Sequence, residues 1–391
     1  MPLTPRLEPQ VVTEQAQLAA LVADLLAQPA VAVDTESNSL YAYHEQVCLI
    51  QFSTPGRDCV VDALARLDLS SLGQVFADPR VEKVFHAAEY DILCLKRDFG
   101  FRFANVFDTM LAARVLGWRR VGLGDLLSEH FGVSSDKRYQ RFDWGQRPLP
   151  PEALRYAALD THFLLPLREI QAAALVECGR WEEAREAFAQ VADTSPVTRG
   201  TSPHDFWRIR GAAELDERGR AVLRELALWR DREAKRLNRP PFKVLPDHTL
   251  VALAALRPRA PADLAGLPGL KAPQVRRYGE RILLAIRQGE RAPAPPPPPE
   301  MHPRPQVVRE RYSALRQWRR QVAAARGVEP DVVLSNATLL ALAERNPHAL
   351  DGLERIPGLG PWKRSTYGPA ILEVLRQVAP AQQRPARKRE T

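Results

Sequence analysis

Two acidic side chains stand two residues apart at the end of a strongly apolar segment. Asp34 and Glu36 close the run AVAVDTE at residues 30–36, and in a β-strand this spacing places both side chains on one face. Two neighbouring carboxylates repel each other unless a cation lies between them. A strand-end turn or a helix cap explains many such pairs, so the pair alone does not establish a site.

Further groups suited to phosphodiester chemistry follow along the chain. Asp91 begins a helical segment directly after the apolar run that ends at His86, and Asp160 lies in a later helical segment. Tyr156 precedes Asp160 by four residues, which places both side chains on one helix face. Four carboxylates from a strand end and two helices can hold two divalent cations about 4 Å apart, as in two-metal phosphodiester hydrolysis. Magnesium suits such an oxygen-only site.

The elements that position these residues are predicted from apolar periodicity. Short runs rich in Val, Ile and Phe predict four strands, the first three of them close enough for a meander; they are 30–36, 47–53, 57–62 and 82–86. After residue 87 the apolar spacing becomes helical. The first half is therefore a mixed α/β domain, predicted at residues 1–200, with a polar boundary near 190–205.

The second half contains an internal repeat. An offset of 89 residues aligns Trp229 with Trp318 and Pro268-Gly269-Leu270 with Pro357-Gly358-Leu359, which is typical of duplicated domains. Each copy has helical periodicity, so we expect two small all-α domains at 215–291 and 308–380. Residues 292–307 are rich in proline and predict an extended linker, and residues 381–391 predict a basic tail.

Composition limits the classes of function. Residues 1–200 carry 20 Lys and Arg against 27 Asp and Glu, a net charge of −7, whereas residues 201–391 carry 35 against 20, a net charge of +15. The basic half predicts affinity for phosphate. No apolar run is long enough to span a membrane and no signal-peptide pattern is present, so we expect a cytoplasmic protein without a membrane partner.

Two further classes are disfavoured. The four cysteines lack Cys-x-x-Cys spacing, which argues against a disulfide framework or a zinc site and predicts small buried hydrophobes. The chain also lacks the Gly-x-x-x-x-Gly-Lys-Ser/Thr loop. A helicase and a nucleotide cofactor are therefore not expected.

Three stretches resemble the motifs of the DEDD superfamily of 3′–5′ exonucleases. VAVDTES followed by LIQFST resembles the first motif, VFHAAEYDILCLKRDFG followed by VFDTMLAARVLG the second, and KRYQRFDWGQRPLPPEALRYAALDTHFLLPL the third, in the form found in ribonuclease D and its relatives. The two repeats resemble the helicase-and-RNase-D C-terminal (HRDC) domain. The resemblance implies an RNase H-like fold followed by two HRDC domains. Phe142 departs from the pattern, since relatives often have serine there.

The resemblance also implies roles for single residues. Asp34 would contact both of two divalent metal ions, Mg²⁺ or Mn²⁺, while Glu36 and Asp160 would hold the ion that carries the attacking water. Asp91 would bind the second ion, and Tyr156 would orient the water, because a phenol with an ordinary pKa of about 10 is a poor base at pH 7. Arg155 stands where the related histidine subfamily has histidine, so the chain resembles the tyrosine subfamily.

Other residues keep two interpretations. Asp108 is an N-cap or a metal ligand, and His86 is a substrate contact or a buried imidazole bonded to its surroundings. The loop residues Lys137, Arg138, Gln140 and Arg147 are contacts to the substrate backbone or a solvated basic loop. A further group of cations lies near the two Pro-Gly-Leu turns: Lys271, Arg276, Arg277, Lys363 and Arg364. These side chains either bind phosphate at a helix start or form a solvated helix face. Trp229 and Trp318 favour core packing over base stacking.

These expectations combine into a metal-dependent 3′–5′ exoribonuclease that releases nucleoside 5′-monophosphates and matures RNA precursors, with tRNA precursors as the implied substrate. One alternative keeps the chemistry and makes single-stranded DNA the substrate. The other is a non-catalytic RNA-binding protein on a nuclease scaffold, against which the complete set of acids argues, because repelling carboxylates are costly to keep without a function.

Overall fold

A computed structural model describes residues 8–134, 137–196, 204–296 and 304–378. The chain divides into two compact units. The first contains Met1–Glu36, Val47–Pro196 and Arg304–Thr391, and the second contains Ser37–Gln46 and Val197–Pro303. The predicted basic tail at 381–391 and the centre of the predicted linker, 297–303, lie outside the described residues.

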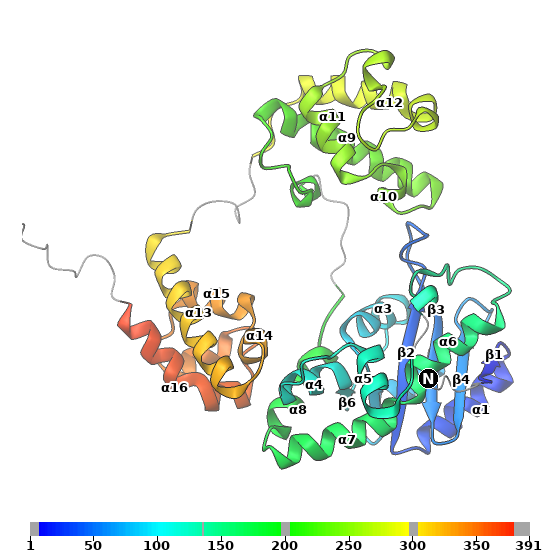
Figure 1. Ribbon diagram of the computed structural model, residues 1–391, viewed down its shortest axis with the longest axis vertical. Coiled ribbons are helices and arrows are strands. Elements are labelled where there is room, and N and C mark those ends of the chain that lie inside the picture. The colour runs from blue at the N-terminus through cyan, green and yellow to red at the C-terminus, as the bar shows by residue number, and fades with distance from the viewer. Residues whose placement is uncertain (1–7, 135–136, 197–203, 297–303, 379–391) are drawn as a thin grey trace, which may run out of the picture. The chain divides into compact units, whose positions relative to one another are not determined.

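A mixed six-stranded sheet forms the centre of the N-terminal half (Figure 1). Its order is β1-β4-β3-β2-β5-β6; β3 runs antiparallel to β4, whereas the pairs β1/β4, β2/β5 and β5/β6 are parallel. The bounds are β1 Gln10–Val12, β2 Ala30–Ser37, β3 Val47–Thr54, β4 Arg57–Asp62, β5 Glu82–Phe85 and β6 Val106–Asp108. All four predicted strands and the meander of β2, β3 and β4 are confirmed, within the mixed α/β fold that was expected.

Helices cover both faces of this sheet. Alternate residues of β2 enter two different cores: Val31 and Val33 pack with residues of α1, α2 and α3, while Ala32 packs with residues of α4, α7 and α8. Burial on both faces explains why β2 is a continuous apolar run rather than an alternating one. The helices are α1 Gln15–Leu26, α2 Leu72–Ala77, α3 Glu89–Phe99, α4 Thr109–Leu116, α5 Leu123–Phe131, α6 Pro151–His162, α7 Leu164–Glu177 and α8 Trp181–Ala192.

The described parts of both repeats are helical, as predicted. The first contains α9 Glu217–Leu237, α10 Pro241–Val244, α11 Asp247–Leu256 and α12 Ala272–Arg291; the second contains α13 Gln306–Arg326, α14 Pro330–Val333, α15 Asn336–Arg345 and α16 Pro361–Gln377. Short 3₁₀ turns complete the chain at Leu69–Ser71, Lys137–Arg141, Asp205–Arg208, Pro261–Leu264 and Leu350–Arg355.

Equivalent contacts recur in the two repeats. Trp229 meets Tyr278 edge-on at 5.7 Å between ring centroids, and Trp318 meets Tyr367 at 5.8 Å. Trp229 lies in the core of the first repeat and the half-buried Trp318 packs against the core of the second, which favours the core-packing interpretation. The second unit also includes the connection between β2 and β3, where the Tyr43 hydroxyl donates to Asp231 at 2.8 Å.

One composition-based expectation is wrong in part. Cys48, Cys59 and Cys94 are buried, but Cys178 is exposed, because it follows the last turn of α7, where the chain leaves the core. No helix in the described part of the chain combines the length and apolar character that crossing a membrane requires.

Candidate active site

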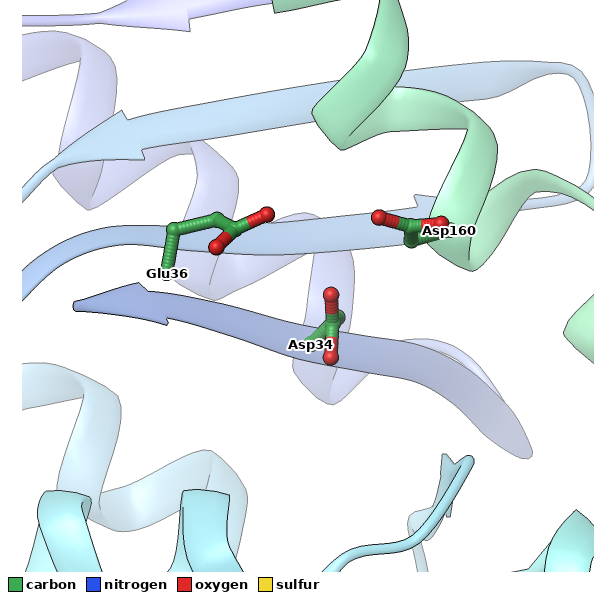
Figure 2. A group of neighbouring side chains, drawn as sticks. All are labelled: Asp34, Glu36 and Asp160. Atoms are coloured by element: carbon green, nitrogen blue, oxygen red, sulfur yellow. The ribbon is translucent and has the colours of Figure 1, made fainter. Parts of the chain in front are cut away.

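Three of the predicted acids converge at one place. Asp34, Glu36 and Asp160 each offer a carboxylate oxygen, and these oxygens lie within 4.8 Å of one another. Figure 2 shows the three carboxylates facing a common space, two of them from β2 and the third from α6. Among the described residues this is the one group of acidic, His or Cys side chains close enough to share a metal ion.

The position of Asp160 depends on how α6 is held on the sheet. The helix packs against β3 and β4, and its last turn is tied to these strands by polar side chains. The hydroxyls of Thr161 and Ser53 lie 2.6 Å apart, and His162 Nδ1 lies 2.8 Å from Asp58 Oδ2. The residues that follow Asp160 directly are therefore fixed to β3 and β4.

Asp91 lies near this group without being one of its three members. It is in the first turn of α3, is 6% exposed, and accepts a hydrogen bond from the Thr35 hydroxyl. Because Thr35 stands between Asp34 and Glu36, this bond links the fourth acid to the strand that carries two others.

Asp108 has the capping role. Its carboxylate accepts hydrogen bonds from the amides of Met110 and Leu111 at the start of α4, which confirms the N-cap. The same carboxylate accepts hydrogen bonds from the amides of Ala87 and Ala88, at 3.1 and 2.8 Å. It therefore also fixes the turn between β5 and α3, which leads to Asp91.

Burial and mutual repulsion perturb the acids strongly. Burial, followed by the charges of Asp91, Asp160 and Glu36, raises the pKa of Asp34 well above its ordinary value. The pKa of Glu36 is raised by burial and by the charges of Asp160 and Asp91. Burial and, for Asp160, the charge of Asp91 raise the pKa values of Asp91 and Asp160 to about 7. A divalent cation among these groups would remove the repulsion, so the residues fit the metal site that the sequence predicts.

Tyr156 lies one helical turn before Asp160 on α6 and is half-buried. The rings of Tyr139 and Trp144 flank its ring, with centroids at 5.6 and 6.2 Å. Both neighbours come from the loop that precedes α6. The loop thus forms the environment of the phenol.

The predicted substrate contacts in the first half fall into different situations. Burial lowers the pKa of His86 to about 4, and its Nδ1 lies 2.9 Å from the Thr109 hydroxyl, which fits the buried-imidazole interpretation. Arg138 and Gln140 are exposed, and the side chain of Lys137 lies outside the described part of the chain. The guanidinium of Arg147 is bonded to Asp62 instead of lying in a solvated loop.

The two repeats present their predicted cations differently. Lys271 and Arg276 are exposed at the start of α12. In the second repeat Lys363 is 8% exposed, burial lowers its pKa, and the nearby amide of Trp362 donates to Glu186 of α8 at 2.6 Å. Burial of Lys363 and the carboxylate already at this helix start count against a phosphate there. Arg364 lies 3.9 Å from Glu354.

Several positioning residues were missed in the sequence. Thr35, Ser53 and Asp58 each bond to an element that carries an acid, yet none belongs to a periodic or motif pattern that announces its role. A weak signal exists for Ser53 alone, since a polar residue inside the buried run VCLIQFST needs a partner. Its partner, Thr161, is distant in the sequence.

The fold and the site define a class. A mixed sheet with half-buried acids converging from a strand end and a helix, followed by two helical repeats, is the arrangement of a nuclease with accessory nucleic-acid-binding domains.

Comparisons with known proteins specify this class. Residues 9–172 match the 3′–5′ exonuclease family, and residues 219–286 and 308–375 each match the HRDC domain. The chain is 39% identical to ribonuclease D of Acidiphilium cryptum over 262 residues, which cover 66% of each chain. It is 31% identical to ribonuclease D of Pseudomonas paraeruginosa over 376 residues, which cover 94% of this chain and 98% of that one. The chain therefore belongs to the ribonuclease D family and is a 3′–5′ exonuclease of that type.

Other relatives differ in how much of the chain they cover. The alignment with exosome complex component 10 of Rattus norvegicus, at 33% identity, covers 72% of this chain but 33% of that longer protein. The catalytic core of RRP6 from Trypanosoma brucei has a TM-score of 0.65 at 28% identity, covering 73% of this chain and 80% of that one. Escherichia coli RNase D shares the fold over 95% of this chain and 99% of that one, with a TM-score of 0.67 at 24% identity.

Proposed function

We propose that the chain shortens RNA from its 3′ end by metal-dependent hydrolysis and releases nucleoside 5′-monophosphates. The observation that carries this proposal is the convergence of three carboxylates within 4.8 Å in a member of the ribonuclease D family. The names of the ribonuclease D relatives support RNA over DNA. Structured precursors such as those of tRNA are the substrate class that we propose.

Two divalent cations, Mg²⁺ or Mn²⁺, are the proposed cofactors. Asp34, Glu36 and Asp160 would hold one ion, and Asp91 together with Asp34 would hold the other. When bound, such ions make water nucleophilic near neutral pH and offset charge on the leaving oxygen. Tyr156 would hydrogen-bond the attacking water and orient it. The raised pKa values imply that the acids give up protons as the ions bind.

The first repeat is the domain that we propose binds the folded part of the RNA. Lys271, the N-cap residue of α12, and Arg276 and Arg277 in its first turns are exposed, at a helix start where backbone amides also favour anions. The equivalent helix start in the second repeat already binds Glu186. Contacts of this kind recognise phosphate and shape rather than base sequence.

The proposal is tested by product release from 3′-labelled RNA with a single-stranded tail, in Mg²⁺ or Mn²⁺. Asp160→Asn removes one ligand charge with little change in shape, and we expect turnover to fall by on the order of 1,000-fold or more. The matched control is Asp125→Asn, a side chain on α5 that is about half exposed (54%), which should retain normal turnover.

Two outcomes contradict the proposal. Normal turnover by Asp160→Asn shows that the assigned acids are not the active site. Equal or faster turnover of a DNA strand with the same sequence rejects the RNA substrate while leaving the site intact.

A further inference from the structure

Two aromatic side chains from the loop that precedes α6 lie against the ring of Tyr156. The ring of Trp144, which is 2% exposed, stacks on that of Tyr156 at an interplanar angle of 26°. The ring of Tyr139 packs against it tilted, at an interplanar angle of 37°. Phe142 meets Trp144 edge-on at 5.1 Å and completes the cluster. The orientation of the phenol therefore depends on where this loop holds its rings.

Arg147 anchors that loop to the sheet. Its Nε and one Nη donate to the two carboxylate oxygens of Asp62 at 2.7 and 2.5 Å. The same guanidinium donates to three carbonyls: those of Trp144 at 2.8 Å, Gln146 at 2.6 Å and Cys48 at 3.2 Å. Because Asp62 ends β4 and Cys48 lies in β3, one side chain joins two strands to the loop.

These bonds use the whole donor capacity of the guanidinium. An arginine side chain has five N–H groups, and the structure assigns each of them an acceptor within this cluster. No N–H remains for a phosphate, so Arg147 does not act as the substrate contact considered from the sequence.

Asp62, the partner of Arg147, is also held by more than one hydrogen bond. Asp62 also accepts a hydrogen bond from the Leu64 amide at 2.9 Å. Burial raises the pKa of Asp62, but the hydrogen bonds from Arg147 and Leu64 outweigh it and leave the pKa below its ordinary value. The pair therefore stays ionised near neutral pH, as a bidentate anchor requires.

We propose that Arg147 is a positioning residue for the reaction, acting on Tyr156 through Trp144 and the loop. This inference rests on the proposed role of Tyr156 as the group that orients the attacking water. A hydroxyl with that task must be held closely, since an error of about 1 Å can cost about 100-fold in rate. Arg147 holds the loop in a fixed position relative to β3 and β4, and the packing of Trp144 and Tyr139 on Tyr156 fixes the phenol in turn.

The test is a double-mutant cycle on the full chain, with kcat and KM measured on 3′-labelled RNA in saturating Mn²⁺. Arg147→Lys keeps the charge but cannot bond both carboxylate oxygens and three carbonyls. We expect kcat to fall about 10- to 100-fold with KM changed by less than about 2-fold. In a Tyr156→Phe background the same substitution should cost less than about 3-fold further, because the hydroxyl that it positions is already absent.

A matched control separates positioning from general stability. Arg168 forms a similarly buried bidentate pair with Glu82, at 2.6 and 3.1 Å, at the opposite end of β5 from the turn that leads to Asp91. Arg168→Lys should lower the melting temperature about as much as Arg147→Lys but leave kcat unchanged. If Arg147→Lys fails to fold, Asp62→Asn replaces it in the cycle.

The results discriminate clearly. If Arg147→Lys lowers kcat by the same factor with and without Tyr156→Phe, the two residues act independently and the positioning role is overturned. A loss of kcat in Arg168→Lys equal to that in Arg147→Lys overturns it as well. Both results leave the proposed function standing. Unchanged kcat in Tyr156→Phe rejects the proposed role of Tyr156 and the positioning role with it.

Discussion

The acids of the site differ from surface carboxylates because burial keeps water from screening their charges. Asp91 is 6% exposed, and the pKa values of Asp91 and Asp160 rise to about 7. Each therefore holds a proton in the metal-free folded protein at a pH where the unfolded chain has lost it. The cluster costs stability in its charged state, and a divalent cation bound among the acids would offset this cost.

The first prediction concerns the stability of the metal-free protein, measured by thermal melting in EDTA. A raised folded-state pKa means that the folded state binds more protons than the unfolded state between about 3.8, the ordinary value, and about 7. Stability therefore falls as pH rises through this window. We expect the melting temperature to drop by on the order of 5 °C between pH 5.5 and 7.5, and Mn²⁺ to abolish the drop.

Asp160→Asn serves as the control for this prediction. Removing one repelling carboxylate should flatten the slope in EDTA and raise the melting temperature at pH 7.5. His86 acts in the opposite direction, because its pKa of about 4 makes the folded state lose stability as pH falls. Since His86 is present in both proteins, its contribution cancels in the comparison. Parallel slopes for the two proteins would contradict the assigned pKa shifts.

At the scale of elements, the two repeats share a turn that only glycine fits. Gly269 and Gly358 both have a φ of 74°, and each lies beside a threonine hydroxyl. This hydroxyl donates a hydrogen bond to the carbonyl of the proline just before the glycine. The bond runs from Thr249 to Pro268 at 2.9 Å in the first repeat and from Thr338 to Pro357 at 3.0 Å in the second. A Cβ on either glycine would collide with that hydroxyl. The turn thus sets where the following helix begins.

The second prediction is that Gly269→Ala loosens the start of α12. Adopting the left-handed region costs a non-glycine residue about 1 to 2 kcal/mol, and the collision with Thr249 adds to it. Gly266→Ala is the matched control, since Gly266 has a φ of 81° but open space around its Cβ position. Hydrogen exchange of the α11 and α12 amides should show a larger loss of protection for Gly269→Ala. Equal losses would mean that the contact with Thr249 is unimportant.

The same elements show what the sequence could predict. Strands such as β2 and β3 were found because burial on both faces leaves continuous apolar runs, and the repeat was found because duplication preserves Trp229, Trp318 and their turns. β1 was missed because three residues are too few for a period. The bond between Thr161 and Ser53 was invisible, since it joins residues 108 positions apart that only the fold brings together.

Arg147 illustrates a different limit. In sequence it is one cation among several in a basic loop, and a solvated or substrate-binding side chain is equally consistent with that composition. Its five acceptors come from the loop itself, β3 and β4. A charge pattern therefore indicates how many cations a segment has, but tertiary structure decides which of them bind the protein itself.

For the whole molecule, the split of charge between the halves needs refinement. Part of the positive charge in the second half is engaged within the chain or withdrawn from its surface: Arg326 pairs with the buried Glu183 of α8, and Lys363 is buried. The net charge of +15 over residues 201–391 thus overstates what that half offers to RNA. We expect the exposed cations of α12 to contribute more than their number suggests.

The third prediction tests this uneven contribution with a charge-reversed variant of the full chain. Lys271→Glu, Arg276→Glu and Arg277→Glu together should weaken binding to structured RNA about tenfold or more. The dependence of log K on log salt should become shallower by about 2 to 3, since each lost phosphate contact contributes about 0.7 for a single strand and about 0.9 for a duplex. The control reverses three exposed arginines of α13, Arg309, Arg316 and Arg320, which gives the same net charge. If both triple variants lose equal affinity, bulk charge governs binding and α12 has no special role. If only the α12 variant does, while turnover of a dinucleotide stays normal in both, the first repeat binds the RNA that the acids of the other unit hydrolyse.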